Sequence, residues 1–310
     1  MSKTEKAVAA YCDMMMKKIE TLSVDWTKPW FDGGLSMPVN ADMKGYHGIN
    51  IIWLWLTCEE RGYNMPVFMT YNRAHQLGAH IRKGEKATPV FFWRLIAKGD
   101  DGKWIDARDA NDGCNVIPVL KCFDVFNIAQ TTMEQDNPEE YGKYISKTHN
   151  EPTPEHGMQY VCEDIDALVD GGWVCPVRVH NSRSAYYNPT TDMINVPEKA
   201  LYYGDDTESG MQYYSTILHE MAHSTGHKSR LDRKMNVNKR SEDYAREELV
   251  AELTAAVIGN GYGFSTHVQE QNAAYLKAWL GNIKKDPRYL MRVMGDVAKA
   301  VGMIQNQINK

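Results

Sequence analysis

Apolar side chains recur at helical spacing in two stretches of the C-terminal half of the chain. Residues 210–226 carry a face of tyrosine and aliphatic side chains that includes Ile217 and Met221, which predicts a buried helix. Residues 243–258 repeat this spacing and are rich in strong helix formers. We therefore expect two neighbouring helices, the first of which ends near Gly226.

The rest of the C-terminal half has a pattern that predicts short strands followed by helices. The strands are expected over residues 174–180, 185–188 and 192–196, with the last two joined as a hairpin. Further helices are expected near residues 160–169, near residues 267–283 and after Asp286 and Pro287, which suit the N-cap and the first helical position. Strands followed by a pair of helices make this half α+β.

The N-terminal half has its own apolar segments and is followed by polar sequence. Residues 49–56 are typical of a buried helical segment that is too short to cross a bilayer, and residues 88–95 of a strand. Polar, proline-containing sequence then suggests a linker. The pattern predicts two domains, residues 1–130 and residues 157–310, joined by a linker of residues 131–156.

Length and composition agree with a two-domain cytoplasmic protein. The chain of 310 residues exceeds what one hydrophobic core usually serves, and 43% of its residues are hydrophobic. Its six cysteines form no CxxC pair and no stretch resembles a signal peptide, so we expect reduced thiols and no membrane segment. Residues 1–130 carry 16 Lys and Arg against 15 Asp and Glu, so any nucleic-acid affinity must come from local patches.

The first predicted C-terminal helix carries the pattern His-Glu-x-x-His. Positions i and i+4 of a helix lie about 6 Å apart on one face, so His219 and His223 can share one metal ion, for which Zn²⁺ is expected. Glu220 lies about 100° round the helix from His219, outside the ligand set but within reach of a metal-bound water. We expect Glu220 to act as the general base of a metallopeptidase.

A catalytic zinc needs a third protein ligand and one open position. His227 would lie about 12 Å from His219 along a continued helix, which is too far, and Ser229 stands where a metzincin would have its third His. On the second helix, Glu248 and Glu252 form an i,i+4 pair on one face. We expect Glu248 to be the third ligand and Glu252 to accept a hydrogen bond from a ligating His. An exchange of these roles, or two solvated charges, stays open.

Two short patches of the N-terminal half combine cations with aromatic side chains or lead into an aromatic strand. The candidate DNA-binding residues in these patches are Trp26, Lys28, Trp30, Arg82, Lys83 and Lys86. Cations along a nucleic-acid backbone and rings that stack on bases are what sequence-tolerant single-strand binding requires. Core packing of the aromatic side chains and an ordinary solvated turn for the cations stay open as alternatives.

Longer segments around these motifs resemble a known family over nearly the whole chain. The run His-Glu-Met-Ala-His-Ser-Thr-Gly-His and the helix Tyr-Ala-Arg-Glu-Glu-Leu-Val-Ala-Glu are similar to the zincin-like metallopeptidase half of ArdC-type antirestriction proteins. The N-terminal half resembles that family's single-stranded-DNA-binding domain at residues 26–30, 46–50, 82–86 and 125–127. The resemblance implies a protein of plasmids and other mobile elements that binds single-stranded DNA and protects incoming DNA from restriction. The Glu-x-x-x-Glu spacing also resembles the gluzincin plan, in which the first Glu binds zinc.

Two classes of function remain open from the sequence. In the first, zinc on His219, His223 and Glu248 supports hydrolysis of a peptide bond in a host protein. In the second, the protein shields single-stranded DNA and the metal only stabilises the C-terminal fold. The peptide substrate, the group that stabilises the oxyanion and the oligomeric state have no signal in the sequence.

Overall fold

The computed structural model describes the chain of 310 residues apart from short segments. The segments outside the description are residues 26–27, 32–34, 99–102, 110–114, 149–160, 182–183, 202–206, 237, 264–265 and 269. Trp26, one of the expected DNA-binding residues, lies outside the described residues.

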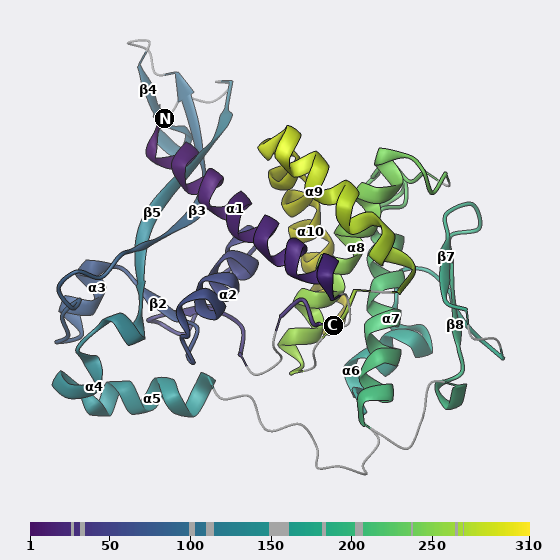
Figure 1. Cartoon of the computed structure of the whole chain (residues 1–310), viewed down its shortest axis with the longest axis horizontal. Helices are drawn as coiled ribbons and strands as arrows, with labels where there is room; N and C mark the ends of the chain where they lie inside the picture. The colour runs from purple at the N-terminus through teal and green to yellow at the C-terminus, as the bar shows by residue number, and fades with distance from the viewer. Residues whose placement is uncertain are drawn as a thin grey trace.

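Helices make up the larger part of the described secondary structure (Figure 1). In chain order they are α1 (Lys3–Val24), α2 (Ile49–Arg61), α3 (Tyr71–Gln76), α4 (Met133–Asp136), α5 (Pro138–Thr148), α6 (Glu163–Ala167), α7 (Thr207–Thr225), α8 (Glu242–Gly261), α9 (Leu276–Lys285) and α10 (Pro287–Ile308). Local sequence determines where several of them begin. The hydroxyl of Ser241 accepts a hydrogen bond from the Tyr244 amide at the start of α8, and Asp286 caps α10 with Pro287 at its first position, as predicted.

The strands form two sheets, so the fold is α+β as predicted. They are β1 (Val39–Asn40), β2 (Val67–Met69), β3 (Thr88–Lys98), β4 (Trp104–Asp106), β5 (Ile117–Asn127), β6 (Val177–His180), β7 (Tyr186–Asn188) and β8 (Met193–Pro197). The first sheet has the order β1-β2-β5-β3-β4 and the second the order β6-β8-β7. The strands β7 and β8 are antiparallel neighbours and form the expected hairpin, whereas β6 runs parallel to β8.

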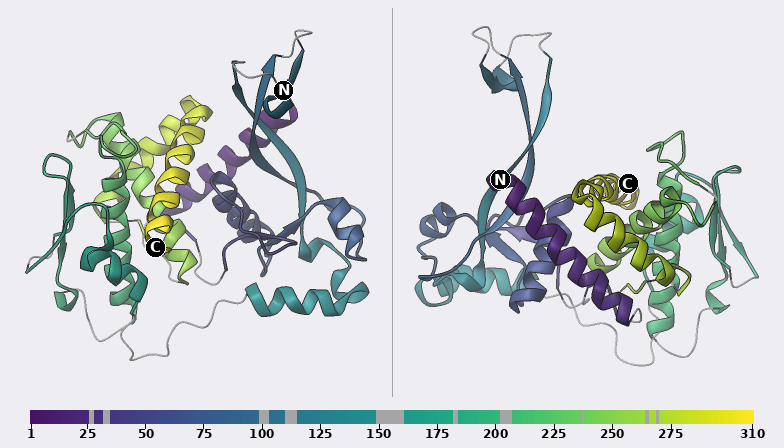
Figure 2. Two further views of the ribbon diagram at one scale, coloured as in Figure 1. Left: turned by 180° about the vertical axis from the view of Figure 1, so that it is seen from behind. Right: turned by 45° about the horizontal axis from the view of Figure 1, so that its top comes forward.

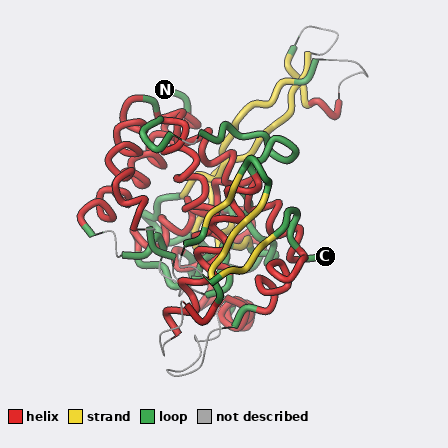
Figure 3. The backbone as a smooth tube through the Cα atoms, turned by 90° about the vertical axis from the view of Figure 1, so that its right-hand side faces the viewer, coloured by secondary structure: helices red, strands yellow, loops and turns green. Residues whose placement is uncertain are grey.

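The long strands β3 and β5 form a ribbon that extends away from the helices (Figures 1 and 3). They pair antiparallel from Thr88 opposite Val125 to Ile96 opposite Ile117, and β4 pairs with the far end of β3. Four consecutive side chains of β3, residues 92–95, are exposed. Since consecutive strand residues point to opposite faces, both faces of this part of the ribbon contact solvent.

One hydrophobic core joins the two halves of the chain. It contains Tyr11 of α1, Leu253 of α8 and Trp279 of α9, all fully buried. The helix α1 packs on α9 and α10, which the second view of Figure 2 shows as neighbours. Residues 1–130 and 157–310, expected as separate domains, thus share one core in this structure.

The segment expected as a linker contains two helices, α4 and α5. Pro138 is the first residue of α5, where its fixed φ suits a helix start, and α4 ends two residues before it. The Tyr144 side chain of α5 is buried in a second apolar cluster with Val67 and Met69 of β2, and its hydroxyl donates to the Ala41 carbonyl at 2.8 Å. Residues 133–148 therefore pack on the N-terminal half.

Candidate metal centre

The last two turns of α7 hold His219, Glu220 and His223 against α8. The apolar side chains expected on this helix are buried, so His219 and His223 point toward the protein interior. The helix ends at Thr225, close to the predicted end at Gly226. A Cβ at Gly226 would lie 2.9 Å from an Arg233 nitrogen, so glycine permits a close approach here.

Three side chains of α7 and α8 bring ligand atoms together. The Nε2 atoms of His219 and His223 lie 3.1 Å apart, and Oε2 of Glu248 lies 3.3 Å from the first and 3.6 Å from the second. Ligand atoms in a tetrahedral zinc site are about 3.3 Å apart, because each bond measures about 2.0–2.1 Å. The three residues therefore fit a divalent metal. Among the described residues no fourth His, Cys, Asp or Glu joins the group, which leaves one tetrahedral position to water or substrate.

His219 and Glu248 are buried and His223 is partly buried, and the charges of the three side chains are strongly coupled. Burial lowers the pKa of His223, but the charge of Glu248 and hydrogen bonds to Glu247 and Glu248 hold it well above its ordinary value. Burial also lowers the pKa of His219, and the hydrogen bond to Glu248 again raises it overall. Burial raises the pKa of Glu248, but the two imidazoles outweigh burial and hold it below its ordinary range. A metal ion would replace the imidazole protons, so its binding should release protons.

The carboxylate beside the other ring nitrogen of His223 belongs to Glu247. Its Oε1 lies 3.2 Å from Nδ1 of His223. Arg233 donates to both oxygens of this carboxylate, at 2.7 and 2.9 Å, and the Arg233 side chain is itself buried. Because Glu247 lies about 100° round α8 from Glu248, it reaches the flank of the His pair. Glu247 and Arg233 are functional candidates that the i,i+4 spacing did not indicate.

Glu252 does not have the position expected for it. Its carboxylate accepts hydrogen bonds from Asn272 at 2.9 Å and from Trp30 at 3.3 Å, and neither donor is a histidine. The Nδ1 atom of His219 has no hydrogen-bond partner among the described residues. The role of orienting a ligating His belongs to Glu247 in this structure, whereas Glu252 lies one turn deeper in the core.

We expect Arg233→Ala to destabilise the metal-free protein by about 3–5 kcal/mol, because it breaks a buried ion pair and leaves His223 as the cationic partner of the Glu247 carboxylate. Urea unfolding measures the change. Arg292→Ala is the matched control, because its ion pair with Asp286 is exposed and such pairs contribute at most about 1 kcal/mol. Equal stabilities of the two variants would contradict the structural role of Arg233.

Glu220, the predicted general base, is oriented by the second sheet. Its Oε2 accepts a hydrogen bond of 2.7 Å from the Tyr187 amide in the middle of β7. The phenol of Tyr187 donates to Asp192, which also forms an ion pair with Arg230 and so ties the hairpin to the segment after α7. The charge of Glu220 also contributes to the raised pKa of His223.

Tyr244 adds a phenol to the centre, one helical turn before Glu248. Burial, the charge of Glu248 and a hydrogen bond to Glu248 raise the pKa of Tyr244, so the hydroxyl keeps its proton. The ring of Tyr275 packs against it with centroids 5.6 Å apart. The sequence patterns did not indicate Tyr244, although it lies four residues before Glu248 and so on the same helix face.

His227 lies apart from the three candidate ligands. Its Nδ1 lies 2.7 Å from the Ser229 hydroxyl and 3.7 Å from an Asp192 carboxylate oxygen. This agrees with the helical spacing, which placed His227 too far from His219 to share an ion.

Comparison with known proteins relates the whole chain to one family. Residues 5–126 match the N-terminal domain of anti-restriction factor ArdC, and residues 164–295 match the zincin-like metallopeptidase family. The metal-free crystal structure of the antirestriction protein ArdC from plasmid R388 has a TM-score of 0.71 and 30% identity, covering 96% of this chain and 97% of that one. The chain belongs to the ArdC antirestriction family. The predicted resemblance is therefore confirmed.

A second R388 ArdC structure and three other proteins are also similar over most of this chain. The Mn(II)-bound R388 ArdC structure has a TM-score of 0.71 and 28% identity, covering 99% of this chain and 98% of that one. The uncharacterized protein y4eC of Sinorhizobium fredii is 30% identical over 87% of this chain and 82% of its own length. Two Escherichia coli proteins named DNA primase TraC are 32% and 30% identical over 93% of this chain, which spans only 26% and 19% of their lengths.

The ArdC N-terminal half places the expected DNA-binding residues in different environments. Trp30 is fully buried, so it cannot stack on a base in this structure. Lys28 is exposed, as are Arg82, Lys83 and Lys86 on the turn before β3. Arg82 also donates to the Ala129 carbonyl at 2.9 Å, which ties the turn to the residues just after β5. Within the part of the chain that the structure describes, no helix is long and apolar enough to span a membrane.

The β3–β5 ribbon presents aromatic side chains that the sequence patches did not include. The exposed ones, between 39% and 65% accessible, are Phe92, Trp93, Trp104 and Phe123. Strand register places Phe92, Trp104 and Phe123 on one face together with three cations, Arg94, Lys98 and Lys121. The Lys98 ammonium lies 5.9 Å from the Trp104 ring centroid. We call this surface the ribbon face.

Proposed function

We propose that the chain is a zinc-dependent peptidase joined to a single-stranded-DNA-binding half, and that it protects incoming DNA from restriction. The observation that carries the peptidase is the tetrahedral spacing of His219, His223 and Glu248 with Glu220 held beside them. Three protein ligands are typical of catalytic zinc, whereas structural zinc has four. Cleavage of a protein by wild type, and not by a Glu220→Gln chain of equal metal content, tests the proposal.

Each side chain has a distinct task in the proposed hydrolysis. A bound divalent metal supplies Lewis-acid polarisation of the carbonyl and makes water more acidic. Glu220 accepts the proton of the attacking water and passes it to the leaving amine, while the Tyr187 amide fixes one of its oxygens. The phenol of Tyr244 would exchange its hydrogen bond to Glu248 for one to the oxygen that gains negative charge.

The ligand set favours zinc over other divalent metals. Two imidazole nitrogens and one carboxylate oxygen in a tetrahedral arrangement are typical of Zn²⁺, whereas Mn²⁺ prefers more oxygen ligands in octahedral geometry. The R388 relative has a Mn(II)-bound structure, which supports the binding of a divalent metal by this chain.

The DNA-binding part of the proposal rests on the turn of residues 82–86 and on the ribbon face. The turn offers exposed cations without a base-stacking ring, and the ribbon face offers exposed rings interleaved with cations. Rings that stack on bases and cations that follow phosphates bind single strands without sequence preference, because every base has an aromatic face. Paired bases of a duplex are not available for such stacking.

We expect Trp104→Ala to weaken single-stranded-DNA binding by about 1–3 kcal/mol with little change in its salt dependence, because the variant loses stacking and no charge.

Arg82→Ala/Lys83→Ala/Lys86→Ala should reduce the slope of log affinity against log salt by about 2, at roughly 0.7 per lost phosphate contact. Fluorescence anisotropy of the full chain at several salt concentrations measures both effects.

The triple variant Lys228→Ala/Lys234→Ala/Lys239→Ala is the charge-matched control, since it removes three exposed cations outside the N-terminal half. It should leave the slope within about 0.5 of wild type, which is less than one phosphate contact. Equal affinity of the wild type for duplex and single strand would overturn the proposed binding mode.

DNA shielding with a purely structural metal is the second candidate function. The burial of the centre favours it, because Glu220 and Glu248 are each only 4% exposed and His219 only 1%. The count of three protein ligands favours catalysis. Shielding requires no proton transfer, so it would survive the loss of Glu220.

A further inference from the structure

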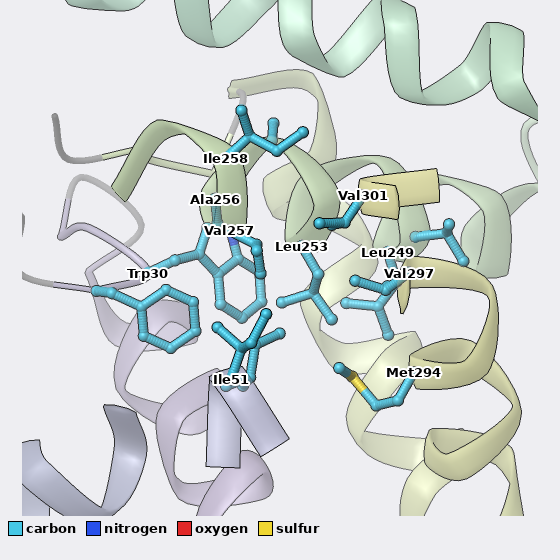
Figure 4. Packing of buried hydrophobic residues seen from close by; sticks show 14 of the residues in the cluster. Trp30, Ile51, Leu249, Leu253, Ala256, Val257, Ile258, Met294, Val297 and Val301 are labelled. Carbon is cyan, nitrogen blue, oxygen red and sulfur yellow. The ribbon is translucent and has the colours of Figure 1, made fainter. Parts of the chain in front are cut away.

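Trp30 comes from the N-terminal half but lies inside the C-terminal half. Its indole packs against Leu253 and Val257 of α8 (Figure 4). The backbone of residues 29–30 is also bound to the C-terminal half. The Trp30 backbone amide donates to the Thr266 carbonyl at 2.9 Å, and Pro29 forms a β-bridge with His267. The position of this side chain is therefore set by C-terminal residues.

The indole N–H of Trp30 enters a buried polar network that ends at the candidate metal ligand Glu248. It donates to Oε2 of Glu252 at 3.3 Å. The side-chain amide of Asn272 donates to Oε1 of Glu252 at 2.9 Å and to Oε2 of Glu248 at 2.8 Å. That Oε2 is the oxygen that lies 3.3 Å from Nε2 of His219, so the network holds the proposed ligand atom itself.

Two buried carboxylates one helical turn apart require donors to remain in place. Glu248 and Glu252 are 4% and 2% exposed, and like charges at i,i+4 repel. Asn272 bridges the two carboxylates, and its bridging geometry depends on Glu252 remaining where Trp30 holds it. An indole N–H can only donate, so Trp30 is the donor in this contact and the Glu252 carboxylate is the acceptor.

We propose that Trp30, through Glu252 and Asn272, is a positioning residue for the third metal ligand, Glu248. The inference rests on the proposed metal centre. It means that the N-terminal half supplies part of the support of a site whose three ligands all come from the C-terminal half. Partners that orient a metal ligand typically change metal affinity by about 10–100-fold when they are lost.

The test compares the zinc affinity of full-length Trp30→Phe and Trp279→Phe with that of wild type, measured by competition with a chelating dye. Trp279 is a matched control: it is also fully buried, its ring lies 6.3 Å from that of Trp30, and its N–H donates to a backbone carbonyl, that of Ala245. We expect Trp30→Phe to weaken zinc binding at least about tenfold and Trp279→Phe to change it less than about threefold. Unchanged affinity in Trp30→Phe, or equal losses in both variants, would overturn the proposal.

Asn272→Leu provides a second test if Trp30→Phe lowers the thermal unfolding temperature of the metal-free chain more than Trp279→Phe does. It removes the donor to Glu248 directly and should weaken zinc binding by the same tenfold or more. Wild-type affinity in Asn272→Leu would overturn the positioning role. Failure of the wild type to bind zinc would contradict the metal centre itself, so the two proposals fail by different measurements.

Discussion

His219→Ala and His223→Ala should each abolish tight binding of the single zinc ion expected per chain. Each removes one of three ligand atoms that lie 3.1 to 3.6 Å apart, and the remaining two cannot define a tetrahedral site. The loss should exceed the roughly 10–100-fold typical of residues that only orient a ligand. Elemental analysis and chelator competition on purified full-length protein measure it.

His227→Ala is the control for this result. It removes an imidazole four residues after His223 that bonds Ser229 and no candidate ligand, so zinc affinity should stay at the wild-type value. Stoichiometric metal in the His219→Ala/His223→Ala double variant would reject the site. A larger loss in Glu252→Ala than in Glu248→Ala would reverse the roles of these two carboxylates.

Glu220→Gln should keep the metal and the fold but lower peptidase activity by about 10²- to 10⁴-fold, because the amide cannot accept the proton of water. Glutamine keeps the shape and can still accept the Tyr187 hydrogen bond, so the loss reports on proton transfer. Mass spectrometry of new peptide N-termini in host lysates treated with each protein measures the activity. Identical cleavage patterns would remove Glu220 from the mechanism.

The same variant separates the two candidate functions in cells. We expect Glu220→Gln to retain most protection of incoming DNA and the triple variant at residues 82, 83 and 86 to lose it, because covering a strand needs no bond cleavage. Restriction of transferred DNA at equal protein levels is the measurement. Loss of protection in Glu220→Gln alone would make proteolysis of a host factor the main activity.

Helical periodicity predicted the parts of the site that depend on one helix at a time. The i,i+4 spacing predicted that His219 and His223 share one face of a helix, and it drew attention to Glu248 on the next helix. One ligand atom from each of these three residues lies close to the other two in the structure. The spacing did not indicate Glu247, because its partner Arg233 comes from an irregular segment after α7 whose path follows from tertiary packing. Residue spacing along one helix contains no information on such a loop.

The solvent exposure of aromatic side chains was the hardest property to predict from the sequence. Trp30 lies beside a cation and a proline, a pattern that fits a stacking platform, yet it is fully buried. Trp93 and Trp104 lie on apolar strands, a pattern that fits a core, yet they are 65% and 52% exposed. Whether a ring is covered depends on elements distant in sequence, here α8 for Trp30.

The core shared by α1 and α9 imposes an order on folding during synthesis. The apolar face of α1 packs partly on N-terminal elements, where the Tyr11 ring lies 5.2 Å from that of Trp53, and partly on α9 and α10, which end near residue 308. At about 5–20 residues per second, those helices leave the ribosome roughly 15–60 s after α1. The part of α1 that packs on α9 and α10 therefore gains its final neighbours late in synthesis, whereas Tyr11 can meet Trp53 of α2 much earlier.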